Sequence, residues 1–216
     1  MSRNMRALKL NALVLAASLG LAATPGAWAV TLYDNLGNKT FSEAMYEAGS
    51  WAASRFTTDT HDYILNTVVL LMYRSGPSTA QLDIFSDSND LPGTSIGTLA
   101  SPESIPLATS EVTFSASGIS LSANSTYWVV LRAPTGQLWW SYTENASGYG
   151  LGFSPIYTAS DYAGSSWDPV DSTYPNKLQI NATLAAVPEP SQWAMMGVTA
   201  LGVTGYALRR RLAKTN

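Results

Sequence analysis

Runs of β-branched, aromatic and other apolar residues recur along the middle of the chain, with turn-forming residues between them. In the longest run, residues 63–73, apolar side chains occupy both alternating faces, and Asn66 interrupts one of them. This pattern predicts a central strand that is covered on both sides. Shorter runs with strand composition or alternation cover residues 81–85, 111–115, 125–133, 137–143 and 177–184.

The segments between these runs are rich in turn formers. Residues 87–93 contain Asp, Ser, Asn, Pro and Gly, and Pro134-Thr135-Gly136 predicts a hairpin turn. Only residues 42–53 have a helical pattern, which Gly49 weakens. Because a βαβ arrangement needs helices between its strands, the sequence predicts an all-β fold, an antiparallel β-sandwich of jelly-roll-like type. The polar stretch 159–175 is predicted to be a long ordered loop.

The first 29 residues have the pattern of a secretory signal peptide. Basic residues precede an apolar segment at 10–23, Pro25-Gly26 ends that segment, and Ala27-Trp28-Ala29 is a small-x-small cleavage site. We expect cleavage after Ala29, so that the mature chain begins at Val30. An uncleaved N-terminal anchor is the alternative.

The C-terminal segment predicts a transmembrane helix. Residues 191–208 carry no charge, and a membrane-spanning helix needs roughly 20 mostly apolar residues. Trp193 near the start suits the headgroup layer, and the basic tail Arg209-Arg210-Arg211, directly after Leu208, favours the cytoplasm. The alternative is a buried C-terminal helix of the globular domain, but such a helix would show polar positions at a period of 3.6.

The triplet Pro188-Glu189-Pro190, the apolar segment and the terminal arginines follow one another over residues 187–216. In this order and spacing they closely resemble the PEP-CTERM sorting signal of Gram-negative bacteria. The resemblance implies recognition of the triplet by exosortase, a membrane protease-transpeptidase that is thought to remove the helix. It also implies a bacterium that produces exopolysaccharide. The expected route is export through the inner membrane, a transient anchor there, and then the cell surface or extracellular matrix.

Residues 30–186 remain as one domain, long enough for a sizeable core. Of the 15 acidic residues in the chain only Glu189 lies outside this segment, whereas only five of the 12 basic residues lie inside it. The domain is therefore acidic, which favours solubility and provides no basic surface for nucleic acid. The chain has no cysteine, which excludes disulfides and cysteine-based metal or catalytic sites.

Three segments of this domain resemble the choice-of-anchor domains, in particular the variant lettered R. They are residues 83–87 followed by Leu91-Pro92-Gly93, the Tyr-Trp strand at 121–131, and Trp139-Trp140. Such domains occur on exported bacterial proteins with interchangeable C-terminal anchors, which agrees with the C-terminal segment. Because the molecular function of these domains is not established, the resemblance implies no catalytic residues.

Candidates for catalysis and metal binding are few. His61 is the only histidine, and a surface histidine beside Asp59 and Asp62 is the simpler interpretation. A pair among the acidic residues could serve a glycoside hydrolase, and the candidates are Asp59, Asp62, Asp83, Asp87, Asp90, Glu103 and Glu111. Oxygen ligands for calcium cluster at Asp87, Asn89 and Asp90, although the full EF-hand pattern is missing and a hydrogen-bonded turn explains them as well.

Aromatic residues provide the candidate ligand site. Trp139 and Trp140 must point to opposite faces of a strand, so one can enter the core while the other meets solvent. With Tyr142 and Tyr149, an exposed tryptophan could form a stacking platform for a pyranose ring. The alternative is that all these aromatic residues belong to the core.

These observations lead to three functional hypotheses. The leading one is a non-enzymatic exported protein of the cell surface or exopolysaccharide matrix, without a cofactor. The second is a polysaccharide-binding module with an exposed aromatic platform. The third is a glycoside hydrolase.

Overall fold

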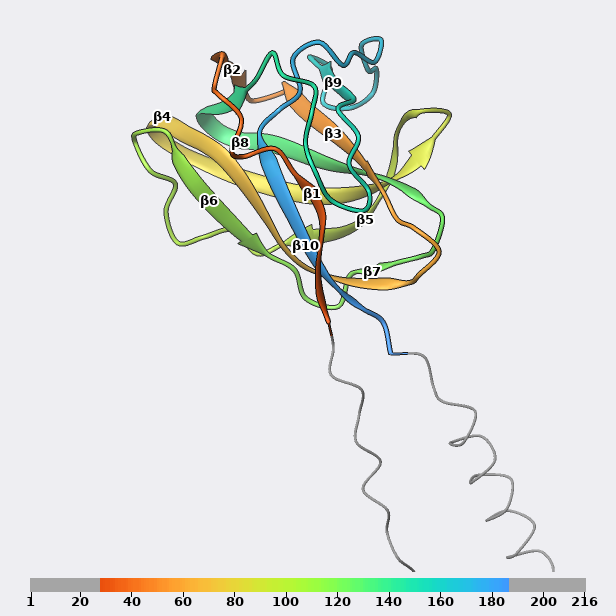
Figure 1. Ribbon diagram of the computed structural model, residues 1–216. Coiled ribbons are helices and arrows are strands. Elements are labelled where there is room, and N and C mark those ends of the chain that lie inside the picture. Colours follow the sequence, from red (N-terminus) through yellow and green to blue (C-terminus); the bar gives the residue numbers. More distant parts are fainter. Residues whose placement is uncertain (1–27, 187–216) are drawn as a thin grey trace, which may run out of the picture.

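The computed structural model describes residues 28–186, and this part of the chain is all-β without a helix (Figure 1). The predicted fold class is thereby confirmed at the level of an antiparallel, curled, sandwich-like sheet. The strands are β1 (Ala29–Asp34), β2 (Ser42–Glu47), β3 (Trp51–Thr57), β4 (Tyr63–Ser88), β5 (Leu91–Leu99), β6 (Ser110–Ser115), β7 (Ser120–Leu121), β8 (Thr126–Tyr142), β9 (Tyr157–Ser160) and β10 (Leu178–Leu184).

Two long strands, β4 and β8, organise the sheet because both pass through its two layers. The first part of β4 pairs with β10, β6 and β7, and its last part pairs with β5. The first part of β8 pairs with β3, and its last part pairs with β2. Between these contacts the two strands pair with each other from Met72↔Trp140 to Ser86↔Tyr127. The main strand order is β1-β10-β4-β8-β3-β9.

The predicted hairpin turn at Pro134-Thr135-Gly136 is wrong, because β8 continues through these residues. They form a bend that lies beside the bend of β4 at Gly76-Pro77, and both glycines have a positive φ, 72° and 71°. Thr79 Oγ1 and Thr135 Oγ1 lie 2.9 Å apart across the bend. The turn formers therefore redirect two paired strands together from one layer into the other, instead of reversing the chain.

The weak helical pattern over residues 42–53 does not correspond to a helix. The segment forms β2 and β3, which pair one after the other with the same strand, β8. A turn joins them, in which Ser50 N donates to Glu47 O and Gly49 has a φ of 95°. Long-range pairing thus overrides a weak local preference.

A bulge explains why apolar residues occupy both faces of the run 63–73. The pairing of β4 with β10 shifts between Thr67 and Leu65, so that Asn66 has no direct partner. Before this shift Tyr63 and Leu65 are buried. After it the core-facing residues are Val68, Leu70 and Met72. The run therefore changes the face that it directs inward, which a β-bulge does by adding one residue to one strand. The strand is not covered evenly on both sides as predicted.

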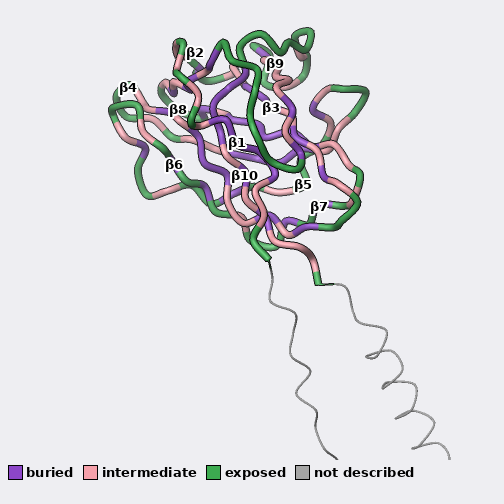
Figure 2. The backbone as a smooth tube through the Cα atoms, viewed as in Figure 1, coloured by how far each residue is buried: buried purple, intermediate pink, exposed green. Residues whose placement is uncertain are grey.

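The core consists of two parts, which lie on opposite faces of the layer formed by β9, β3, the first part of β8, the last part of β4 and β5. The larger part lies between the layers and includes Trp140, Val129 and Ile180. The smaller part lies on the outer face and consists of Ala53, Phe85, Trp128 and Val130, against which Trp51, Ile156 and Trp167 pack. Figure 2 shows this arrangement as a buried interior with exposed loops around it. In the predicted loop 159–175, the first two residues belong to β9. Trp167 of the same segment packs against the smaller part of the core.

The two ends of the described segment lie at the same end of the domain. Strands β1 and β10 are antiparallel neighbours from Ala29↔Thr183 to Asp34↔Gln179, and Leu184 N donates to Trp28 O. Figure 1 shows both chain ends leaving below these strands, opposite β2 and β9. Residues 1–27 of the predicted signal peptide and the predicted sorting signal at 187–216 lie outside the described residues.

No helix among residues 28–186 has the length and apolar character required to cross a membrane.

Candidate functional site

Trp139 lies on the outer face of β8, between β2 and β4. Its cross-strand neighbours are Met45 and Tyr73. The Trp139 and Tyr73 rings are parallel within 7°, with centroids 5.8 Å apart, and Met45 is 41% exposed. We call Met45, Tyr73 and Trp139 the aromatic platform. It contains one of the aromatic residues predicted to contact a glycan.

Trp140 points the other way and is fully buried. Its indole Nε1 donates to the Lys177 carbonyl oxygen at 2.9 Å, so the polar end of the side chain is satisfied inside the core. The alternation expected of the Trp139-Trp140 pair is present. Trp140 therefore stabilises the sandwich and is not accessible to a ligand.

Tyr142 belongs to a second aromatic group, which we call the rim cluster. It consists of Tyr142, Phe41 and Tyr174, of which Phe41 is 53% and Tyr174 39% exposed. The Phe41 and Tyr174 rings stack with centroids 5.4 Å apart, and the Tyr142 ring meets Tyr174 edge-on at 5.7 Å. Phe41 directly precedes β2, so the cluster lies at the end of the domain opposite the chain ends.

Tyr149 is separate from both groups. Its hydroxyl donates to Asp34 Oδ2 at 2.6 Å, and Gln179 Nε2 donates to the same oxygen at 2.5 Å. The side chain is 65% exposed, but its polar end fixes the segment around residue 149 to β1. Of the four residues predicted to contact a glycan, Trp140 lies in the core, whereas Trp139, Tyr142 and Tyr149 lie in three separate places on the surface. The four residues therefore do not form one site.

A glycine-spaced strap, residues 148–152, closes the sandwich and was not predicted from the sequence. Gly152 N donates to Leu32 O on β1 at 2.8 Å, and Gly152 O accepts from Thr57 N on β3 at 3.0 Å. The backbones approach so closely that a Cβ atom on Gly152 would lie 1.7 Å from Thr57 O. The pattern Gly148-x-Gly150-x-Gly152 was the available signal, since glycine permits this close approach.

The calcium candidates form the turn between β4 and β5. Asn89 and Asp90 both have a positive φ, 54° and 62°, as the tight turns of hairpins require. Asp87 accepts from Trp128 Nε1 at 2.8 Å and from Asp90 N at 3.2 Å, while Asp90 pairs with Arg55 at 3.3 Å. The carboxylates thus have structural partners, and Leu91-Pro92-Gly93 belongs to β5 and not to the turn.

A buried ion pair lies on the outer face beside Trp51. Asp83 is fully buried and pairs with Arg132, whose guanidinium carbon lies 4.6 Å from the centre of a Trp51 ring. Asp83 also accepts from Thr98 Oγ1 at 2.5 Å and from Gln81 Nε2 at 3.3 Å. Beside the pair, at the bend of β8, is a hollow of about 230 Å³ that Trp51, Gln81 and Arg132 help to line. Arg132, which helps to line this hollow, already pairs with the buried carboxylate of Asp83.

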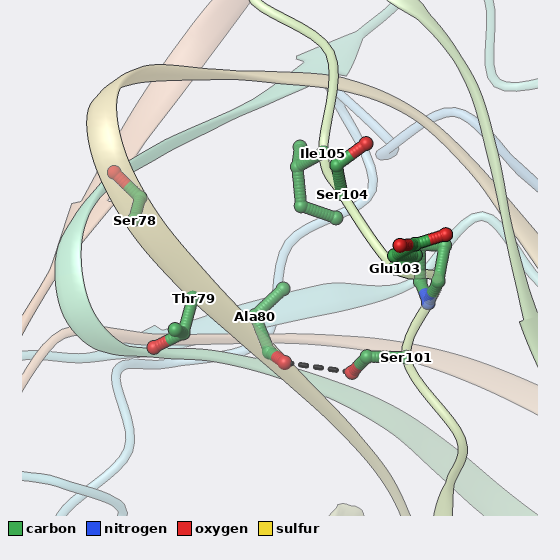
Figure 3. Close-up of a pocket in the computed structure, with 8 residues that line it drawn as sticks. Ser78, Thr79, Ala80, Ser101, Glu103, Ser104 and Ile105 are labelled. Carbon is green, nitrogen blue, oxygen red and sulfur yellow. Dashed lines mark hydrogen bonds between the residues drawn. The ribbon is translucent and has the colours of Figure 1, made fainter.

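A further hollow, of about 170 Å³, lies where residues 101–105 cross the bend of β4 (Figure 3). Ser101 Oγ donates to Ala80 O at 2.8 Å, and Ser78 Oγ accepts from Gln137 N at 2.9 Å. The hydroxyl groups of Ser78 and Ser101 therefore take part in backbone contacts that hold the bend.

His61 lies in a hydrogen-bonded turn before β4. Its Nδ1 is 3.1 Å from Asp59 Oδ1, which also accepts from His61 N at 2.9 Å and from the Tyr63 hydroxyl at 2.8 Å. Asp62 Oδ1 accepts from Ala123 N at 2.7 Å. These acidic groups fix the turn. Within residues 28–186, no set of three or more histidine or acidic side chains gathers as a metal site.

This turn gives a pH prediction. Burial, together with the bond to Asp59, raises the pKa of Tyr63 to about 12, so the fold favours the neutral phenol. The stabilisation is fully present below pH 10, the ordinary pKa of tyrosine, and is lost as the pH rises toward 12. Urea unfolding should show a fall in the free energy of unfolding as the pH rises from 10 toward 12, and Tyr63→Phe should make this fall shallower. Tyr162→Phe, at a side chain that is 71% exposed, serves as the control. An equally steep fall in both variants would contradict the assignment.

No protein-family model matches the chain, and no curated protein matches it significantly.

Proposed function

We propose that this chain is an exported, non-enzymatic protein of the cell surface or the exopolysaccharide matrix. A signal peptide over residues 1–29 directs export, and the PEP-CTERM-like segment 187–216 holds the domain in the inner membrane until an exosortase removes the helix. The domain between them is a jelly-roll-like β-sandwich of the choice-of-anchor type. Its partners are the exosortase, the inner membrane before cleavage, and exopolysaccharide, but not nucleic acid.

The observation that supports this proposal most directly is the pairing of β1 with β10. Because the two strands are antiparallel neighbours, both chain connections leave from one end of the domain. The opposite end, with β2 and β9 (Figure 1), then faces away from the membrane while the domain is anchored. Cleavage of either connection leaves the core and the exposed aromatic groups unchanged.

A second candidate function, polysaccharide binding, is supported by the aromatic groups on the surface. Tyr73 stacks on Trp139 and Phe41 stacks on Tyr174, both pairs are partly exposed, and a pyranose ring can extend such a stack. Amphipathic aromatic rings combine a large apolar contact with polar edges. This function and a location in a polysaccharide matrix are compatible.

The sorting signal can be tested by two variants. Replacement of Pro188-Glu189-Pro190 with alanines should leave the protein uncleaved in the inner membrane. Replacement of Arg209-Arg210-Arg211 with serines should release some chains without proper cleavage, because each arginine resists the hydrocarbon by roughly 2.5–3.5 kcal/mol at a helix centre. Cell fractionation and the intact mass of the protein measure both effects. Gln192→Ala is the control and should be sorted normally, whereas normal sorting of both variants would refute the proposal.

A further inference from the structure

We propose that the aromatic platform binds a polysaccharide that carries free amino groups, with Glu43 and Glu47 as the partners of those groups. This inference rests on the proposed polysaccharide-binding function and specifies the class of sugar. It combines two features of one surface, the parallel rings of Tyr73 and Trp139 and the carboxylates on the neighbouring strand.

Register places the two carboxylates on either side of the platform. In β2, Glu43 and Glu47 are the alternate neighbours of Met45, so all three share the outer face with Trp139. Each glutamate lies roughly 7 Å from Met45 along the strand. A sugar ring stacked on the platform therefore has a carboxylate within reach in both directions along a polymer.

These carboxylates have no cationic partner. The ion pairs of residues 28–186 join Arg55 to Asp90, His61 to Asp59 and Arg132 to Asp83. Glu47 accepts only a neutral bond, from Gln137 Nε2 at 3.3 Å. A third acidic residue, Glu111, lies on the adjoining part of the sheet, opposite Leu71. Glu43 and Glu47 consequently place negative charge beside the platform, which attracts ammonium groups and repels uronates.

The basic residues of the domain are too few to offset this field, since residues 30–186 contain five of them against 14 acidic residues. Arg74 donates through Nε to Ile105 O at 2.7 Å, and Lys177 donates through Nζ to Asn38 O and to Thr40 Oγ1. Arg55 and Arg132 belong to the ion pairs above. Cationic groups on a ligand also interact favourably with the faces of aromatic rings. Amino sugars satisfy both requirements of the platform, whereas neutral sugars satisfy only the stacking.

The test compares three soluble oligosaccharides of equal length: a β-linked glucosamine hexamer, its N-acetylated form and a hexauronate. Titration calorimetry with the chain purified from cells in detergent should show binding of the glucosamine hexamer about three- to tenfold tighter than that of the acetylated one, as expected for two exposed ion pairs. The hexauronate should not bind. The preference should decrease in high salt.

Variants test whether the preference for the free amine arises at the aromatic platform and its two glutamates. Glu43→Gln with Glu47→Gln should remove the preference for the free amine and preserve binding of the acetylated hexamer. Trp139→Ala should abolish binding of both, while Tyr162→Ala, in an exposed loop, should change neither; melting temperatures verify that each variant is folded. Equal affinity for both hexamers, or a preference that survives the glutamine variant, would overturn the inference and leave polysaccharide binding intact. If the wild-type chain bound neither hexamer, the binding function itself would fail, while surface sorting would still be judged by fractionation.

Discussion

Arg132→Met is expected to lower the free energy of unfolding by roughly 3 kcal/mol, the lower end of the range for breaking a buried ion pair. The substitution removes the cation that neutralises Asp83, whose side chain is 1% exposed, and leaves a carboxylate in the outer core with only neutral donors. The Arg132 side chain is 23% exposed, which is why the lower end applies. Urea unfolding at pH 7 measures the change.

A second variant identifies the cause. Asp83→Leu combined with Arg132→Met replaces both charges with apolar groups and should recover most of the lost stability, since a buried pair often contributes little over a well-packed apolar pair. If the double variant were as unstable as Arg132→Met alone, the loss would come from the missing contact with Trp51 and not from the unpaired charge.

Gly152→Ala is expected to destabilise the domain by more than about 3 kcal/mol, beyond the usual cost of overpacking. The added Cβ would lie 1.7 Å from Thr57 O, so a backbone segment must move and weaken the contacts from Gly152 to Leu32 and Thr57. For a domain of this size the melting temperature should fall by roughly 6–12 °C. Gly37→Ala is the matched control, because nothing lies within 4 Å of its Cβ position. A similar melting temperature for both variants would show that the strap does not hold β1 and β3 together.

The sequence predicted the strands that alternate regularly and failed where the chain bends. In β6 buried residues alternate with exposed ones, and in β10 they alternate with half-buried ones, so periodicity alone is sufficient. The bends at Gly76-Pro77 and Pro134-Thr135-Gly136 contain the same residues as true turns, and only the pairing of two distant strands keeps both extended. The bulge at Asn66 has a similar origin, because its signal resembles a strand that is buried on both faces.

The candidate site was predictable in part for the same reason. Local alternation separates Trp139 from Trp140 without any tertiary information. The partner of Trp139 could not be read from the sequence, because Tyr73 lies far away along the chain and meets it through strand register. Glu43 and Glu47 were hidden by the helical pattern of their segment, since only an extended strand places both beside Met45.

Strand β10 leads directly to the C-terminal segment and lies between β1 and β4 rather than at an edge. Tension applied at residue 186 while the far end of the domain is held therefore runs along the axis of β10. The ladders on both sides of the strand then carry the load together in shear, instead of opening one bond at a time as a peeled edge strand would. Lifetimes under force are set by the rate of unfolding. A domain pulled through this strand is consequently expected to unfold by shear rather than by peeling.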